Sequence, residues 1–316
     1  MKFLFISPRF SGGIGGHAAM LSDQLVQAGH EVTKMKTSHI PIKNLKNPSF
    51  AIFGTIQGLT NTKKYDIVHA FNVPSAFAMR YAKGRKKVLS IHGVFSDQVK
   101  KLHSGTVSSI ASSTESRVLK WADALTTDSK ISRNEYKKKL NFDFEYLPSA
   151  IDTVKLESIP NVKKISNQII YLGRDSQEKG IDVLKNSESK INGKVVYCTN
   201  LPWADAMKLL KSSDVLAVPS RMESLPTNIK EAFFLKIPVV ATNVGGIPEL
   251  VSHNKTGILV PSEDFTQLSV EINKILKNKE NFNEIIENAH QFVIHEMSWK
   301  KILPKYLKFY EDLLNN

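Results

Sequence analysis

Short apolar runs alternate with amphipathic segments of helical period along nearly the whole chain. Many of these runs are continuous stretches of Val, Ile and Leu, which is typical of strands buried on both faces of a parallel sheet. The predicted strands cover residues 3–7, 32–35, 67–71, 88–92, 124–127, 145–147, 169–173, 195–198, 215–219, 239–242 and 257–260. The predicted helices cover residues 17–27, 107–121, 203–210 and 228–235. This alternation favours right-handed βαβ units and therefore an α/β fold.

The strand series restarts near Gln168, after a polar stretch at residues 152–167. A chain of 316 residues is also longer than one hydrophobic core usually organises. We therefore predict two Rossmann-like, doubly wound parallel-sheet domains that face a central cleft, with a boundary near residues 150–166. Ligands of such folds bind at the carboxyl ends of the strands, so we expect the functional site there.

Composition narrows the class of protein. The longest apolar runs, such as residues 237–241, are far shorter than the roughly 20 residues that span a bilayer. The apolar stretch at the N-terminus is only four residues long and is not followed by a cleavage site of signal-peptide type. A single cysteine, Cys198, excludes an internal disulfide framework. We expect a globular protein of the cytoplasm.

Positive charge is concentrated in the first half. Residues 1–150 hold 22 Lys and Arg against 10 Asp and Glu, whereas residues 151–316 hold 21 against 20. The basic half would suit an anionic membrane surface or a phosphate-bearing substrate, or it is simply a solvated face. Its main clusters, at residues 83–87 and 137–139, contain no interleaved aromatic residues, so we expect no nucleic-acid partner.

The loop after the first predicted strand reads Ser11-Gly12-Gly13-Ile14-Gly15-Gly16-His17-Ala18. Its glycines allow close backbone approach to a ligand, and the helix that follows offers N–H groups to an anion. Gly13, Gly15 and Ala18 fit the dinucleotide fingerprint G-x-G-x-x-A. The second strand ends in Lys34-Met35-Lys36 instead of an acidic residue, so NADP stays open as a ligand, as does a turn without ligand.

Two further motifs follow predicted strands. In Ile91-His92-Gly93, the histidine stands where it can reach a substrate hydroxyl, although a lone histidine is more often structural. In Gly173-Arg174 with Lys179-Gly180, two cations beside a helix N-terminus could clamp a diphosphate. The interleaved Asp175 and Glu178 equally suit an ordinary exposed loop.

The most informative segment is residues 219–232, PSRMESLPTNIKEA, which leaves a buried strand and enters a helix. Glu223 stands in the loop and Glu231 in the helix, so both carboxylates can face one ligand. Pro226 and Thr227 suit the helix start, where backbone N–H groups are available to bind oxygens.

These motifs, with Pro238-Val239-Val240-Ala241-Thr242-x-x-Gly245-Gly246-x-Pro248-Glu249 as the last, resemble family 4 glycosyltransferases in kind and order. Members of that family have the GT-B fold, two Rossmann-like domains around a cleft. The resemblance implies an acceptor-binding domain at residues 1–155, onto which a terminal helix at 298–316 packs back. It implies a nucleotide-sugar-binding domain at residues 156–297.

The resemblance also implies transfer of a sugar from a nucleotide-diphosphate sugar to an acceptor hydroxyl, with retained anomeric configuration, no metal and no further cofactor. Arg174 and Lys179 would neutralise the departing diphosphate. Glu231 would hold the ribose, and the backbone at Gly15 and Gly16 would approach the phosphates. His92 would touch the transferred sugar. Glu223 would hold the sugar hydroxyls together with the loop residues Ser224, Leu225, Pro226 and Thr227, which replace the glycine-rich run of many members.

The acceptor is then expected to be a glycan or a lipid-linked molecule, and the protein either free in the cytoplasm or peripheral on the inner membrane face. Three alternatives stay open. One is a catalytically degenerate partner subunit that binds a nucleotide-sugar, another is a nucleotide-sugar epimerase, and the third is an NADP-dependent oxidoreductase.

Overall fold

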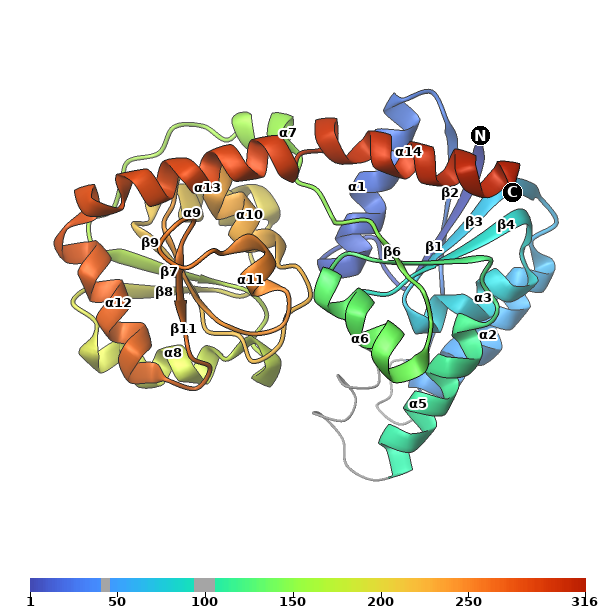
Figure 1. Ribbon diagram of the computed structural model, residues 1–316, viewed down its shortest axis with the longest axis horizontal. Coiled ribbons are helices and arrows are strands. Elements are labelled where there is room, and N and C mark those ends of the chain that lie inside the picture. The colour runs from blue at the N-terminus through green and yellow to red at the C-terminus, as the bar shows by residue number, and fades with distance from the viewer. Residues whose placement is uncertain (41–45, 94–105) are drawn as a thin grey trace. The chain divides into compact units, whose positions relative to one another are not determined.

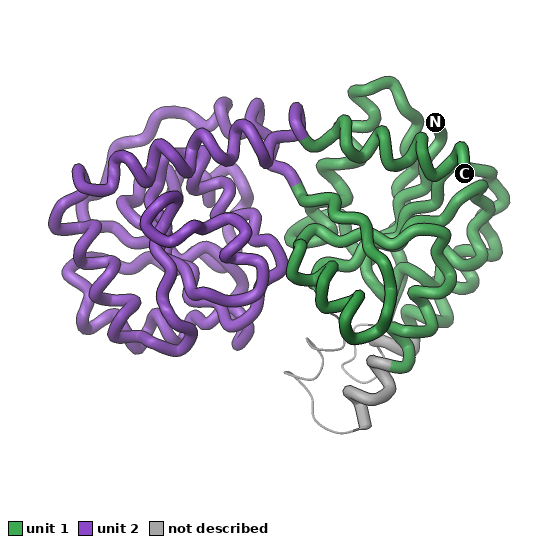
Figure 2. Tube along the Cα trace, in the orientation of Figure 1, with its two compact units in different colours: residues 1–149, 302–316 green, residues 150–301 purple. Residues whose placement is uncertain are grey.

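The computed structural model describes residues 1–40, 46–93 and 106–316, with side chains described outside residues 41–48 and 94–112. It divides into two compact units (Figure 2). Unit 1 comprises residues 1–149 and 302–316, and unit 2 comprises residues 150–301. No helix in the described ranges combines the length and the apolar character needed to cross a membrane.

Unit 1 is built on a parallel sheet with the strand order β2-β1-β3-β4-β5-β6. The strands are β1 (Lys2–Ser7), β2 (Glu31–Lys36), β3 (Lys64–Phe71), β4 (Lys83–Ser90), β5 (Ala124–Thr127) and β6 (Glu145–Tyr146). The helices are α1 (Gly13–Gln27), α2 (Lys46–Thr60), α3 (Ala76–Tyr81), α5 (Thr106–Leu119), α6 (Lys130–Leu140) and α14 (Trp299–Asn315), which starts in unit 2. Helices cover both faces of the sheet (Figure 1).

Helix α14 is anchored to unit 1 by two buried tyrosines. The Tyr310 hydroxyl lies 2.7 Å from Nδ1 of His69 on β3. The Tyr306 hydroxyl lies 2.9 Å from Nε2 of His17 and donates to the carbonyl of Leu147 at 2.9 Å. Because both tyrosines are almost wholly buried and polar, these bonds fix the helix in one position on the sheet.

Unit 2 repeats the architecture with five parallel strands in the order β11-β10-β9-β7-β8. The strands are β7 (Gln168–Leu172), β8 (Lys194–Cys198), β9 (Val215–Val218), β10 (Val239–Thr242) and β11 (Ile258–Val260). The helices are α7 (Thr153–Glu157), α8 (Ile181–Ser187), α9 (Trp203–Ser212), α10 (Thr227–Phe234), α11 (Ile247–Leu250), α12 (Phe265–Lys277) and α13 (Asn283–Glu296). One apolar core joins the sheet to α9, α10 and α13, and another joins it to α8 and α12.

All eleven predicted strands are present, and the prediction of two doubly wound parallel-sheet domains of the α/β class is confirmed. Strand β4 differs most from its prediction, because it begins at Lys83 and ends at Ser90, two residues before His92. The basic cluster at residues 83–87 is therefore part of the sheet and pairs with the start of β3. Lysine can occupy such positions because its aliphatic stem packs while its ammonium reaches solvent.

Candidate functional site

The best-defined polar cluster lies in unit 2, where the loops after β7 and β9 meet. In the strand order β8-β7-β9-β10-β11, the chain moves from β7 to one side and from β9 to the other. This change of direction is the topological switch point at which doubly wound sheets bind ligands. The loop after β7 carries Arg174, Glu178 and Lys179, and the loop after β9 carries Ser220 and Glu223.

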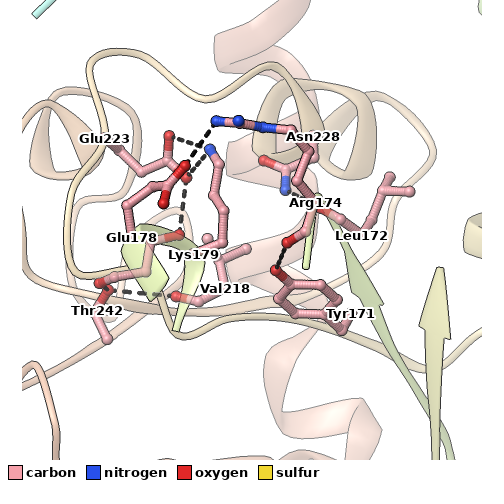
Figure 3. Close-up of polar contacts among 10 residues, drawn as sticks. Tyr171, Leu172, Arg174, Glu178, Lys179, Val218, Glu223, Asn228 and Thr242 are labelled. Atoms are coloured by element: carbon pink, nitrogen blue, oxygen red, sulfur yellow. Dashed lines mark hydrogen bonds and ion pairs between the residues drawn. The ribbon is translucent and has the colours of Figure 1, made fainter. Parts of the chain in front are cut away.

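Lys179 and Glu223 form the centre of this cluster (Figure 3). The Lys179 ammonium donates to both carboxylate oxygens of Glu223, at 2.7 and 2.8 Å, and the Ser220 hydroxyl donates to Oε1 at 2.8 Å. The Glu223 side chain is only 7% exposed, so the pair is partly shielded from water. Among the described residues, Oε2 accepts from Lys179 alone, and a carboxylate oxygen has a second lone pair for a ligand hydroxyl.

Two glycines allow these loops to pack so closely. Gly180 and Gly245 both have positive φ, of 63° and 50°. A Cβ atom at Gly180 would lie 2.0 Å from the carbonyl oxygen of Pro219, and one at Gly245 would lie 2.0 Å from that of Glu223. The Gly246 N–H also donates to the Glu223 carbonyl at 3.2 Å. The Gly245-Gly246 motif thus has a physical role, which is to hold the backbone of Glu223 in place.

Arg174 extends the cluster toward solvent. Its guanidinium donates to Oε1 of Glu178 at 2.9 Å, and its side chain is 62% exposed. Burial alone would raise the pKa of the Glu178 carboxyl, but hydrogen bonds and the charges of Arg174 and Lys179 lower it overall. The Tyr171 hydroxyl donates to the Arg174 carbonyl at 2.6 Å, and burial raises the pKa of this tyrosine so that it remains a donor. Two cations and two carboxylates therefore lie together.

Glu231 lies on α10, eight residues beyond Glu223, and is nearly buried. The indole N–H of Trp203 donates to its Oε1 at 2.8 Å, while the Lys155 ammonium lies 4.3 Å from the centre of the Trp203 ring. Burial raises the pKa of Glu231 to about 7, against the opposing effects of Trp203, Lys230 and Lys155. This carboxyl group can thus change its charge near neutral pH.

The predicted sugar-binding loop leads directly into α10. Leu225 and Pro226 are buried, whereas Ser224 and Thr227 are partly exposed. Pro226 occupies the N-cap position, and no side chain caps the helix. The N–H groups of the first turn have no intrahelical carbonyl partner, so this segment presents backbone donors to ligand oxygens.

In unit 1, the glycine loop enters α1. Gly12 and Gly13 have positive φ, of 56° and 42°. Gly15 is buried, and a Cβ there would lie 2.2 Å from the Arg9 carbonyl oxygen, so a larger residue does not fit. The Gly16 N–H donates to the Gly12 carbonyl at 2.9 Å. Gly16 therefore already uses its donor within the helix, and residues 13–15 hold the N–H groups that α1 itself leaves without a partner.

His92 follows β4 at the carboxyl edge of the same sheet. Its Nδ1 lies 3.0 Å from Oδ2 of Asp128, which comes directly after β5 and is only 3% exposed. The His92 ring is also 5.3 Å from the ring of His17, the residue after Gly16. Within unit 1, the structure therefore brings His92 and the glycine loop together.

Three of the predicted site residues, Arg174, Lys179 and Glu223, form one cluster, and Glu231 lies in the same unit with Trp203. Sequence reasoning missed Asp128, Trp203 and the pairing of Glu178. Asp128 carried a usable signal, since it follows a buried strand directly, as His92 nearly does. In the ranges that the structure describes, no group of three His, Cys, Asp or Glu side chains is arranged to hold a metal ion.

The sequence and the fold of this chain are similar to those of known glycosyltransferases. The family profile described as Glycosyltransferase Family 4 matches residues 11–155, and the profile described as Glycosyl transferases group 1 matches residues 185–292. An uncharacterized glycosyltransferase of Methanocaldococcus jannaschii is 23% identical, over 96% of this chain and 95% of the relative.

Solved structures match over nearly the full length. Sucrose-phosphate synthase of Thermosynechococcus elongatus superposes with a TM-score of 0.82 at 17% identity, covering 99% of both chains. HepE of Anabaena, solved in complex with UDP-glucose, gives a TM-score of 0.72 at 16% identity, covering 99% of this chain and 100% of HepE. The fold is GT-B, and the chain belongs to the family 4 glycosyltransferases.

Proposed function

We propose that this protein moves a sugar from a nucleotide-diphosphate sugar to an acceptor hydroxyl, with retention of anomeric configuration and without a metal. The observation that carries the proposal is the cluster of Lys179, Arg174 and Glu223 at the switch point of unit 2, directly before the N-terminus of α10. Cations suit a diphosphate, while carboxylate oxygens suit sugar hydroxyls. The UDP-glucose complex of HepE supports a donor of this class.

In this proposal, Arg174 and Lys179 bind the diphosphate of the donor. The guanidinium has five N–H donors and the ammonium three, so each can contact phosphate while it keeps its carboxylate partner. The ion pairs with Glu178 and Glu223 hold the two cations in position before the donor arrives. As the bond to the sugar breaks, negative charge grows on the leaving diphosphate, and both cations stabilise it.

The other predicted site residues take their roles in this proposal from the resemblance to family 4 glycosyltransferases. Glu223 and the backbone of residues 224–227, with Ser224, Leu225, Pro226 and Thr227, hold the sugar hydroxyls, and Glu231 holds the ribose. Gly15 and Gly16 approach the phosphates, and His92 contacts the transferred sugar. Residues 156–297 thus act as the donor domain. Residues 1–155, with the helix at 298–316, act as the acceptor domain for a glycan or a lipid-linked molecule.

The transfer step needs no protein nucleophile. The acceptor oxygen forms its bond to the anomeric carbon on the face from which the diphosphate leaves, and the proton of the acceptor hydroxyl moves to a leaving phosphate oxygen. One C–O bond breaks, one forms, and the configuration is retained. His92 and Glu223 position the ring during this step, which lowers the barrier by orientation.

The first test is thermal unfolding of wild type and Arg174→Ala with UDP-, GDP-, ADP- and TDP-sugars, with NADPH as control. A ligand at about 100 times its Kd stabilises the folded state by about 2.7 kcal/mol. We expect one nucleotide-sugar to stabilise the wild type and the variant to respond less. Stabilisation by NADPH alone would favour the oxidoreductase, and no response to any donor would contradict the proposal.

The second test concerns the reaction itself. With the donor identified, the anomeric configuration of the product is read by NMR, with EDTA present and absent. Retention that is unaffected by EDTA supports the proposal. Inversion or a metal requirement would contradict it, as would conversion of the donor sugar without any acceptor, which indicates an epimerase. A donor that is bound but never hydrolysed or transferred would indicate the degenerate partner.

A further inference from the structure

Helix α2 carries an exposed row of large aliphatic side chains. The row consists of Ile52, Ile56 and Leu59, whose side chains are 59%, 51% and 60% exposed. Their spacing of four and three residues places them on one face of the helix. The opposite face packs tightly on α3, because Gly58 approaches so closely that a Cβ there would lie 2.4 Å from the Ala78 carbonyl oxygen. The glycine face of α2 is thus packed against α3, and the aliphatic row is left exposed.

Ile52 and Ile56 of this row also line a cavity of about 520 Å3 that opens between α2, α3 and α5. The three helices lie together on one face of unit 1 (Figure 1). Phe77 and Trp121 line the cavity, with ring centres 5.3 Å apart. The Arg80 guanidinium lies 4.5 Å from the Trp121 ring centre, and Arg117 also lines the cavity. The groove thus combines apolar walls with cationic groups.

Among the described residues, few acidic side chains lie near this groove; the exposed one is Asp123, two residues after Trp121, whose carboxylate accepts from the Lys87 N–H at 2.6 Å. Between residues 32 and 96 the chain has 11 Lys and Arg but a single acid, Asp66, which lies 3.7 Å from Arg85. Helices α2 and α3 contain no acidic residue at all. On α5, Glu115 is buried and accepts a hydrogen bond from Tyr136, so it does not reach the surface. Lys83 and Arg85, directly after α3, are exposed.

We propose that this surface, defined as Ile52, Ile56 and Leu59 with the groove of Arg80, Arg117 and Trp121, docks the protein on an anionic phospholipid bilayer. The aliphatic side chains insert among the acyl chains while the cations contact lipid phosphates. Protruding aliphatic groups on a face with more exposed cations than acids match an anionic membrane in both polarity and charge. The inference is independent of the proposed function, because none of these residues lies in the proposed donor site.

The test is sedimentation of the full-length protein with vesicles of phosphatidylcholine alone and of phosphatidylcholine mixed with phosphatidylglycerol, at low and high salt. We expect binding to the mixed vesicles only, weakened by salt. The triple variant Ile52→Gln, Ile56→Gln, Leu59→Gln should lower the partition coefficient by roughly tenfold or more. The double variant Arg80→Gln, Arg117→Gln should weaken binding and flatten its dependence on salt.

Matched controls come from the same unit. Val26 and Ile131 are exposed apolar residues outside this surface, and Lys137 and Lys138 are exposed cations on α6. Their Gln variants should bind vesicles like wild type, and all variants should keep the wild-type thermal shift with the donor. Equal losses in the controls would overturn the proposal, as would failure of wild type to bind the mixed vesicles, which would indicate an acidic protein partner instead.

Discussion

The two units share one architecture but place their charges differently. Both contain the strand arrangement β2-β1-β3-β4-β5 or its counterpart β8-β7-β9-β10-β11. Unit 1 has a net charge of +12 and unit 2 of +1. Yet the cation cluster at a switch point lies in the nearly neutral unit, where Lys179 and Arg174 are paired with carboxylates. In the basic unit, Lys83, Arg85 and Arg80 lie on the outer surface.

Under the proposed function, net charge and anion recognition are separate properties of the two units. Carboxylates that orient a cation cancel its contribution to the net charge, while they improve its geometry for a diphosphate. An excess of surface cations instead gives a long-range field, which suits a charged surface rather than one small ligand.

The largest effect is expected from Lys179→Met in unit 2. In the proposed mechanism the ammonium stabilises the leaving diphosphate, so its loss should lower kcat/KM roughly 10²- to 10³-fold. Steady-state transfer assays measure this change. Lys185→Met, at an exposed lysine of α8 in the same unit, is the matched control and should react like wild type.

The Lys179 variant also leaves the nearly buried Glu223 carboxylate without its main partner, which lowers stability. The double variant Lys179→Met, Glu223→Gln removes that unpaired charge, so its melting temperature should recover while its activity stays low. If activity recovered together with stability, the role of Lys179 would be structural, and unit 2 would not owe its activity to this cation.

A smaller effect, on stability, is expected when the glycine motif of unit 2 is compared with the glycine loop of unit 1. Gly245→Ala in unit 2 places a side chain on a left-handed backbone and its Cβ atom against the Glu223 carbonyl. The free energy of unfolding should therefore fall by about 1–3 kcal/mol. Gly16→Ala in unit 1 meets only an atom at 3.8 Å within a helix and should be neutral or stabilising. Denaturant unfolding distinguishes them, and equal losses would contradict this explanation of the Gly245-Gly246 motif.

In unit 1, Asp128 is expected to act by positioning His92. Asp128→Asn keeps the size of the side chain but weakens its bond to the imidazole, so kcat should fall roughly 10- to 100-fold with little change in donor binding. Asp143→Asn, at an exposed acid of the same unit, is the control. In a double-mutant cycle with His92→Ala the losses should not add, and full additivity would rule out a joint role.

Much of the fold could be predicted from the sequence because most strands are β-branched runs buried on both faces. The predicted and observed bounds agree fully for Ala124–Thr127 and Val239–Thr242. They disagree most at β4, whose first half is Lys-rich. A lysine-rich segment has no periodic apolar signal, and only its pairing with β3 in the folded sheet makes it a strand.

The residues of the candidate site could be grouped from the sequence only where they lie close together in one motif. Gly173, Arg174 and Lys179 are near neighbours, but the bond between Lys179 and Glu223 joins positions 44 residues apart. The sequence leaves open whether Glu178 is an ordinary loop charge, because its pairing with Arg174 is seen only in the folded loop. Trp203 donates to Glu231 across 28 residues from another helix, and its role depends on tertiary packing alone.

The smallest expected effect is the pH dependence of donor binding through Glu231. Its pKa, raised to about 7 by burial, keeps the carboxyl protonated at pH 6 and ionised at pH 8. Ribose hydroxyls donate more strongly to the ionised form, so donor affinity should rise roughly three- to tenfold from pH 6 to pH 8. Calorimetry with the intact nucleotide-sugar avoids the titrating terminal phosphate of a free nucleotide. Glu231→Gln should bind weakly with no such rise, because its amide does not titrate. An equal rise in both proteins would assign the pH dependence to another group and remove Glu231 from the ribose site.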